Sequence, residues 1–169
     1  MASRPTPSFL TFLGVIAVRF GLVLVIAVAF AQTPGRVEAQ LPPGLGQVTG
    51  EVVWVDFWAS WCAPCRRSFP WMNQMLDRYG PEGLQIIGMN LDKERTLAQG
   101  FLDETPAKFD IRYDPEAKLA EEFGVQAMPS SFLLDSSGNV IATHYGFRLD
   151  DTEAYETDII NALARSGGQ

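Results

Sequence analysis

The distribution of apolar residues divides residues 51–168 into segments of two kinds. Nearly continuous apolar runs rich in β-branched and aromatic residues are typical of strands buried on both faces, and two occur, EVVWVDFWAS (51–60) and LQIIGMNLD (84–92). Between these runs, apolar side chains recur at helical spacing. This spacing predicts a helix that begins near Cys62, contains Pro70 and ends at YGPEG (79–83).

Strand and helix patterns continue to alternate after residue 92. The further predicted elements are a helix over RTLAQGFLDET (95–105), a short strand over FDIRYD (109–114), a helix over DPEAKLAEEFG (114–124), two hairpin strands over SSFLLD (130–135) and VIATHYGF (140–147), and a last helix over 150–168. In the helix over 114–124, Asp114 is the expected N-cap, Pro115 the first helical residue and Gly124 the C-cap. This order predicts an α/β domain with a parallel core, to which the hairpin adds antiparallel strands.

The N-terminal segment differs from the rest because residues 9–31 contain a single charged side chain, Arg19. Residues 1–31 are predicted to be either a signal peptide with an A-x-A cleavage site at 29–31 or a membrane anchor, since residues 9–31 are long enough to span a bilayer. Both interpretations place the following domain outside the cytoplasm, in a periplasmic or other extracytoplasmic compartment. The Gly- and Pro-rich residues 32–47 predict a linker, and the domain is expected over 48–169.

The charge balance argues against a nucleic-acid partner. The net charge of the whole chain is −7, and without the leader, which carries Arg4 and Arg19, 11 basic residues face 20 acidic ones. Phosphate contacts require clustered Lys and Arg, so a domain of this composition is not expected to bind DNA or RNA. The acidity itself is typical of a soluble surface.

The chain has two cysteines, Cys62 and Cys65, and three uses for such a pair compete. As a structural staple, a disulfide that closes so short a loop removes little chain entropy. As a zinc site, the pair lacks partners, because structural zinc takes four ligands and the single histidine, His144, lies far along the chain. We predict neither a metal site nor a bound cofactor, and we expect His144 to be an ordinary strand residue.

Redox chemistry fits the position of the pair better. A helix N-terminus stabilises a thiolate, and in Cys-x-x-Cys settings it lowers the pKa of the first thiol below its usual value of about 8.5. We therefore expect Cys62 to be the exposed, attacking sulfur and Cys65 to be the more buried, resolving one. Arg66 and Arg67 either lower the Cys62 pKa further or are ordinary solvated helix residues.

The segment VDFWASWCAPCR (55–66) resembles the active-site segment of the thioredoxin superfamily, and the larger pattern is similar to its TlpA-like branch of extracytoplasmic thiol-disulfide oxidoreductases. Trp61 and Pro70 match the family's tryptophan before the first cysteine and its kink proline. The resemblance covers about residues 48–165. It implies a thioredoxin-like fold, with a central mixed sheet, flanking helices and a TlpA-type strand–helix insertion.

The segment GVQAMPSSFLLDSSGNV (124–140) matches the part of the family that carries a cis-proline and the following hairpin. The resemblance implies that the Met128–Pro129 bond is cis, which an X-Pro bond tolerates at low cost, and that it lies beside Cys62. The Met128 main chain would then be free to pair with an extended substrate strand. The expected substrate-binding residues are Trp61, Ala63, Pro64, Met128 and Pro129.

Asp56 lies six residues before Cys62, where thioredoxins carry a buried acid. Burial raises the pKa of a carboxyl group, so this side chain would be able to exchange a proton with Cys65, directly or through water. The alternative is a carboxylate at the end of the strand that faces solvent.

Two departures from the family pattern concern acidic residues. Ser68 occupies a position where many TlpA-like members have an acid, and no residue aligns cleanly with a functional glutamate of the insertion, although Asp92 and Glu94 are near. These departures put the substrate specificity in doubt, and the redox pair is unaffected.

The leading hypothesis is an extracytoplasmic reductase of protein disulfides that works through a mixed disulfide, with cytochrome c maturation as one possible setting. The expected partners are disulfide-containing proteins and a membrane thiol electron donor, and residues 9–31 would attach an uncleaved chain to the inner membrane. One alternative is a thiol oxidant or isomerase of the same fold. Another is a thioredoxin-fold binding module whose cysteines are idle.

Overall fold

The computed structural model describes residues 41–167, which lie in one compact unit. The predicted signal peptide or anchor and most of the predicted linker lie outside the described residues. Within residues 41–167, no helix has the length and apolarity needed to cross a membrane.

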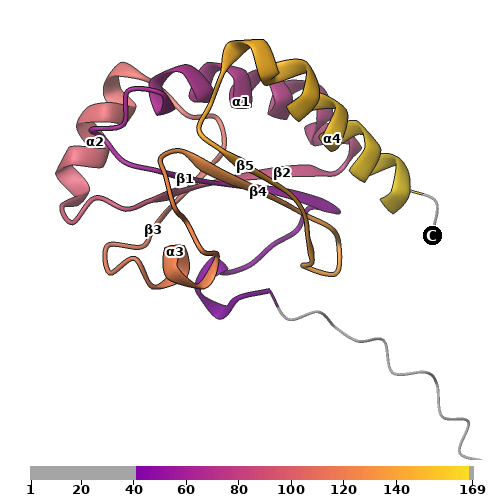
Figure 1. Ribbon diagram of the computed structural model, residues 1–169, viewed down its shortest axis with the longest axis horizontal. Coiled ribbons are helices and arrows are strands. Elements are labelled where there is room, and N and C mark those ends of the chain that lie inside the picture. Colours follow the sequence, from indigo (N-terminus) through magenta and orange to yellow (C-terminus); the bar gives the residue numbers. More distant parts are fainter. Residues whose placement is uncertain (1–40, 168–169) are drawn as a thin grey trace, which may run out of the picture. The chain divides into compact units, whose positions relative to one another are not determined.

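A five-stranded mixed sheet forms the centre of the domain, in the order β3-β2-β1-β4-β5 (Figure 1). The strands are β1 (Val52–Trp58), β2 (Leu84–Asn90), β3 (Asp110–Tyr113), β4 (Ser130–Leu134) and β5 (Val140–Tyr145). Strand β2 pairs in parallel with both β1 and β3, whereas β4 is antiparallel to β1 and to β5. All seven residues of β1 are buried, as expected of its nearly continuous apolar pattern. The predicted mixed sheet is thus confirmed.

Helices cover both faces of this sheet. Helices α1 (Cys65–Tyr79), α2 (Arg95–Glu104) and α4 (Thr152–Ser166) lie on one face, and the short α3 (Lys118–Glu122) and the 3₁₀ turn η1 (Pro43–Leu45) lie on the other (Figure 1). Two further 3₁₀ turns are η2 (Gly80–Glu82) and η3 (Leu149–Asp151). This is the α/β thioredoxin-like architecture that the sequence predicts, with β2, α2 and β3 between the redox segment and the hairpin.

The alternation of side chains along β1 divides the core into two clusters. Trp54 and Trp58 point into the larger cluster, beneath α1, α2 and α4, while Val53, Val55 and Phe57 point into the smaller cluster beside α3. Successive strand residues face opposite sides of a sheet, so Asp56 shares the face of Trp54 and Trp58. The face that carries Asp56 is therefore the one that carries α1 and the cysteines.

Two helices begin later than predicted. Helix α1 begins at Cys65 and not near Cys62, because residues 59–64 form a turn in which the Cys62 N–H donates to the Ala59 carbonyl at 3.1 Å. Helix α3 begins at Lys118 and not at Pro115, because Ala117 has a left-handed backbone with φ of 55°.

Asp114 nevertheless caps α3, as predicted, although it lies four residues before the first helical residue and not next to it. Its carboxylate accepts hydrogen bonds from the N–H groups of Lys118 and Ala120 at 3.0 and 2.9 Å. Gly124 follows the helix with φ of 67°, a left-handed conformation that glycine adopts without strain.

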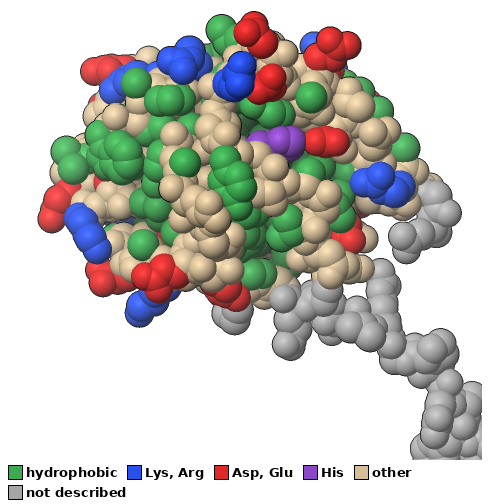
Figure 2. Space-filling model, viewed as in Figure 1, with side chains coloured by type: hydrophobic (Ala, Val, Ile, Leu, Met, Phe, Trp, Pro, Cys, Tyr) green, Lys and Arg blue, Asp and Glu red, His purple; other side chains and the backbone are tan. Residues whose placement is uncertain are grey.

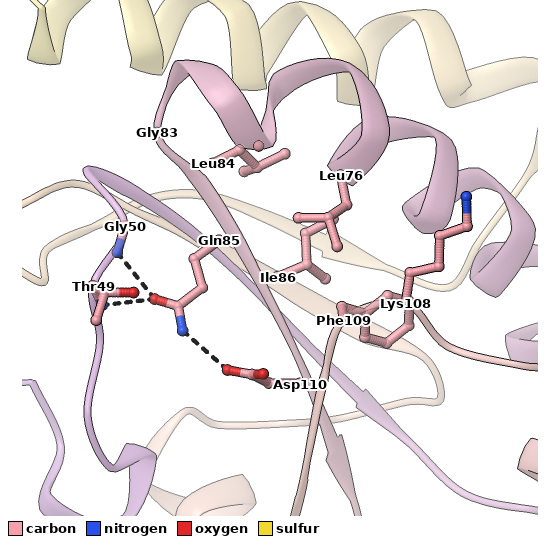
Figure 3. A pocket seen from close by; sticks show the side chains of 11 residues that line it. Thr49, Gly50, Leu76, Gly83, Leu84, Gln85, Ile86, Lys108, Phe109 and Asp110 are labelled. Atoms are coloured by element: carbon pink, nitrogen blue, oxygen red, sulfur yellow. Dashed lines mark hydrogen bonds between the residues drawn. The ribbon is translucent and has the colours of Figure 1, made fainter.

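The ordered domain extends further toward the N-terminus than residue 48. Leu45 is fully buried in the smaller cluster, and the Arg112 guanidinium donates hydrogen bonds to the carbonyls of Leu45 and Gln47. The Gln85 side chain accepts hydrogen bonds from the N–H groups of Thr49 and Gly50 (Figure 3). Leu41 and Leu45 of the predicted linker are therefore packed against the smaller cluster.

The pocket in Figure 3, of about 330 Å³, lies at the N-terminal end of β2 and is lined by Gln85, Asp110 and Lys108 among others. The cysteines follow the C-terminal end of β1, which pairs with the C-terminal end of β2, so this pocket is at the opposite end of the sheet. On the face drawn in Figure 2, basic side chains are scattered among acidic ones and form no single patch.

Candidate active site

Cys62 and Cys65 form a disulfide at the start of α1, with an S–S distance of 2.04 Å and a Cα–Cα distance of 5.3 Å. Strand β1 ends at Trp58, a turn follows, and Pro64 precedes the first helical residue with helical dihedral angles. The N–H of Cys65 donates to the sulfur of Cys62 at 3.2 Å. A free backbone N–H at a helix start thus points at the sulfur that was predicted to attack.

The burial of the pair differs from the expectation in one respect. Cys65 is fully buried as expected, but Cys62 is only 3% exposed and was expected to be accessible. Cys62 is buried because it belongs to the larger apolar cluster, against which Met128 also packs. The exposed groups around it are its neighbours, since Trp61 is 70% exposed and Ala63 is also exposed.

The turn before the cysteines is held by Asp92, whose side chain is buried just beyond the end of β2. Its carboxylate accepts hydrogen bonds from the N–H and the hydroxyl of Ser60, both at 2.9 Å, and from the Asn90 amide at 2.8 Å. These bonds join the loop of Trp61 and Cys62 to the neighbouring strand. From the sequence, Asp92 was near the position of the family's insertion glutamate, and no role was assigned to it.

The Met128–Pro129 peptide bond is cis, as the family resemblance implied. Pro129 is buried and immediately precedes β4, whose first residue, Ser130, pairs with Phe57 near the end of β1. The cis-proline and the cysteine turn are therefore at the same end of the sheet. The Pro129 carbonyl accepts a hydrogen bond from Gly146 at 2.7 Å, and the Ser130 hydroxyl donates to the Ala127 carbonyl at 2.7 Å.

Asp56 is buried rather than facing solvent, because only 1% of it is exposed. Burial raises the pKa of its carboxyl group from 3.8 to about 7, and a hydrogen bond from the Ser131 hydroxyl partly opposes this rise. The distance from Ser131 Oγ to Asp56 Oδ1 is 2.6 Å. A carboxyl group that titrates near neutral pH is suited to proton transfer.

The two arginines after Cys65 differ in their surroundings. Arg66 forms an ion pair with Glu104 at 2.7 Å and lies 4.7 Å from the centre of the Phe101 ring, so its charge is shared with α2. Arg67 is exposed. Ser68, at the position where related chains have an acid, is buried and donates to the Cys65 carbonyl at 3.1 Å.

His144 lies in β5, as predicted, and stacks on Trp54 with ring centres 5.3 Å apart. Its Nε2 is 3.3 Å from Asp158 Oδ2, but no hydrogen bond joins the two side chains. Burial lowers the pKa of His144, against the opposing effect of Asp158 and Asp151. Among the residues that the structure describes, no three His, Cys, Asp or Glu side chains are placed to hold a metal.

Comparison with known proteins adds to this geometry. The family model described as Redoxin matches residues 43–159. The chain belongs to the redoxin family. The matched range includes the disulfide, the cis-proline and Asp56, and it begins at η1, in agreement with the burial of Leu45.

Relatives of this redoxin carry names from thiol-disulfide chemistry. The thiol-disulfide oxidoreductase ResA of Bacillus anthracis is 32% identical over 97 residues, which are 57% of this chain and 56% of ResA. The redoxin thus spans little more than half the length of these curated relatives. A thiol:disulfide interchange protein DsbE homologue of Paracoccus denitrificans is 34% identical over 142 residues, covering 79% of this chain and 76% of the homologue.

Solved structures agree with the fold of this redoxin. A Chlorobium tepidum structure assigned as thiol:disulfide interchange protein DsbE superposes with a TM-score of 0.66 and 50% identity, and the match covers 68% of this chain and 82% of that one. StoA from Bacillus subtilis is 23% identical with a TM-score of 0.57, covering 66% and 84% of the two chains, and supports the fold alone.

Of the site residues predicted from sequence, the cysteines, Trp61, Ala63 and Pro64 follow one another in the turn and the start of α1, and the cis-proline segment lies at the same end of the sheet. Sequence reasoning missed Ser131. The available signal was its place two residues after Pro129, in the predicted hairpin strand 130–135, because a polar side chain that is buried in a strand requires a partner.

Proposed function

We propose that this chain is an extracytoplasmic thiol-disulfide oxidoreductase that reduces disulfides in other proteins. The observation that carries the proposal is the Cys62–Cys65 disulfide at the start of α1, with the Cys65 N–H directed at the sulfur of Cys62. In the reduced protein the same N–H and the helix dipole favour a thiolate on Cys62. The names of the relatives support the reaction class.

The reaction proceeds in two exchanges. The Cys62 thiolate attacks one sulfur of the substrate disulfide and forms a mixed disulfide, and the other substrate sulfur leaves as a thiolate. Cys65 loses its proton and attacks Cys62, which releases the second substrate thiol and leaves the Cys62–Cys65 disulfide. Asp56, buried on the sheet face that α1 covers, is the proposed acceptor of the Cys65 proton.

The substrate is proposed to bind as an extended segment between Trp61 and the cis-proline turn. Trp61 offers an exposed ring beside the disulfide, and Ala63 and Pro64 follow it in the same turn. No hydrogen bond joins the Met128 main chain to another backbone group within residues 41–167, so its N–H and carbonyl are available for pairing with a substrate strand.

The predicted signal peptide or anchor supports an extracytoplasmic location, and a membrane thiol donor would then have to reduce the pair after each turnover. Cytochrome c maturation is the narrower setting that the resemblance to the TlpA-like branch implies. A reductant is favoured over an oxidant because of the same resemblance.

The test is the reduction potential of the full chain, combined with a trap. A potential near the thioredoxin value of about −270 mV supports a reductant, whereas one near about −120 mV would make the chain an oxidant. A Cys65→Ala variant should retain its client as a mixed disulfide on Cys62, and a Cys62→Ser variant should retain none. If Cys62→Ser left activity intact, the chain would be a binding module with idle cysteines.

A further inference from the structure

A buried pair of polar side chains joins the two central antiparallel strands behind the active site. Asp56 of β1 stands opposite Ser131 of β4 in the strand register, and their side-chain oxygens are 2.6 Å apart. Asp56 and Ser131 are 1% and 4% exposed, respectively. Because an ionised carboxylate has no hydrogen to give, the Ser131 hydroxyl is the donor and Asp56 Oδ1 the acceptor.

The two oxygens of the Asp56 carboxyl group have different surroundings. Oδ1 accepts the Ser131 hydrogen, whereas Oδ2 is buried and has no hydrogen-bond partner among the described residues. When the carboxyl group is neutral, an oxygen that already accepts a hydrogen bond is the better carbonyl oxygen, and the oxygen without a donor is free to carry the proton. The asymmetry therefore favours protonation at Oδ2.

The elements packed around Asp56 provide few other groups that could set its protonation. Strand β2 presents Gly88 opposite it, and α1 contributes Cys65 to the cluster on this face. On the far side of Ser131, β5 presents His144, and α4 carries Tyr155 and Asp158 near that histidine. Ser131 is thus the one hydrogen-bond donor that touches the carboxyl group within residues 41–167.

We propose that Ser131 is a positioning residue that occupies Oδ1 of Asp56, so that Oδ2 is the oxygen that takes the proton from Cys65 during the second thiol-disulfide exchange. This inference rests on the proposed function. The step is balanced: the Cys65 S–H bond breaks, an Oδ2–H bond forms, Cys65 becomes a thiolate and attacks Cys62, and the substrate thiolate leaves and takes its proton from solvent.

The hydrogen bond also controls how readily the carboxyl group ionises. Burial favours the neutral form, and the Ser131 hydroxyl stabilises the charged form. A hydrogen bond to a charged group contributes enough to move a pKa by roughly one to two units. Loss of the hydroxyl should therefore raise the pKa of Asp56 by that amount.

The direct test is a carbon-13 NMR titration of the Asp56 carboxyl group in the oxidised full chain, which requires no enzymatic activity. We expect an upward shift of roughly one to two pKa units in Ser131→Ala. Ser131→Thr and Ser131→Val form a second pair, with the same side-chain shape, in which the first should resemble the wild type and the second the alanine variant. An Asp56 pKa that is the same in the wild type and in all three variants would overturn the inference.

Ser130→Ala is the matched control, because Ser130 is the neighbouring buried serine of β4 and its hydroxyl bonds to Ala127. This variant should leave the pKa of Asp56 unchanged, and a pKa shift as large as that in Ser131→Ala would also contradict the inference. The carbonyl stretch of the neutral Asp56 gives the oxygen assignment. It should move to higher frequency in Ser131→Ala, since Oδ1 loses its hydrogen bond, and an unchanged frequency would refute Oδ1 as the carbonyl oxygen.

The kinetic test separates this inference from the proposed function. The pH at which the release of substrate from the mixed disulfide reaches half its maximum rate should rise in Ser131→Ala by the shift seen in the NMR titration. This effect should vanish when Asp56 is already Asn. If the wild-type chain reduces no disulfide at any pH, the proposed function is refuted. If the chain is active but its pH profile is the same in the wild type and in Ser131→Ala, only the role of Ser131 is refuted.

Discussion

Substitution of Asp56 by Asn should remove a large, pH-dependent cost in stability. Asp56 is buried beside the apolar cluster that includes Trp54 and Trp58, and one of its oxygens has no hydrogen-bond partner in the described part of the chain. Asn has nearly the same shape, can still accept the Ser131 hydrogen, and carries no charge at any pH. The variant therefore isolates the cost of ionising this one carboxyl group.

The magnitude follows from the pKa of Asp56, which burial raises from 3.8 to about 7. Between these two values the folded protein keeps a proton that the unfolded chain has released, so the free energy of unfolding falls as the pH rises. The difference of about three units, at about 1.4 kcal/mol per unit, gives about 4 kcal/mol in total. Below pH 3.8 both states are protonated and above about 7 both are ionised, so the change is confined to this window.

The assay is urea denaturation of the oxidised full chain at several pH values from 4 to 8, for the wild type and for Asp56→Asn. The difference in unfolding free energy between the two should move in favour of the variant by about 4 kcal/mol across this range. Asp150→Asn, which removes an exposed carboxylate, is the control and should show little such movement. Parallel stability curves for the wild type and Asp56→Asn would show that the carboxyl group is not desolvated in the folded state.

Three further predictions concern the surroundings of the disulfide and the start of the domain. Trp61→Ala should leave the unfolding free energy within about 0.5 kcal/mol, since the side chain is 70% exposed, but should raise KM for a protein disulfide roughly tenfold in steady-state assays; an unchanged KM would remove Trp61 from the binding surface. Asp92→Ala should lower the unfolding free energy by about 3 kcal/mol in urea titrations, because it leaves the Ser60 and Asn90 donors without their acceptor. A loss under about 0.5 kcal/mol would argue that Asp92 does not hold the turn before Cys62. Leu45→Ala should cost about 3 kcal/mol by the same measurement, whereas a neutral result would mean that residues 41–47 are a linker after all.

Much of the fold follows from the pattern of apolar residues. A nearly continuous apolar strand such as residues 52–58 is expected in the middle of a sheet, and the helix that follows it makes the next strand along the chain, β2, parallel to it. The position of the cysteine pair directly after this strand placed it at the start of a helix, and the structure agrees apart from the helix beginning at Cys65. These features depend on local periodicity, which the sequence displays directly.

The rest depends on contacts between residues that are distant in sequence. The turn before Cys62 is held by Asp92, 30 residues further along, and Asp56 is bonded to Ser131, which is 75 residues away. The late start of α3 results from a left-handed Ala117, which its residue type disfavours. From its Gly- and Pro-rich surroundings, Leu45 was predicted to belong to a linker, and only the structure shows that it is buried against α3. The periodicity of apolar residues along the chain gives no information about such long-range contacts.

In β1, the side chain of Asp56 lowers the stability of the domain when it is charged, but the same side chain is the proposed proton acceptor. In the row that faces α1, Trp54 and Trp58 favour folding through burial, and the carboxyl group between them opposes folding whenever it is charged. A neutral residue there would give a more stable domain at pH 8, yet it would leave Cys65 without its proposed proton acceptor. Ser131 moderates this conflict, since its hydrogen bond lowers the cost of the charged form while leaving Oδ2 without a partner. A domain selected for stability alone would place an apolar residue at position 56. The buried acid is therefore a cost in stability that the proposed transfer of a proton from Cys65 would explain.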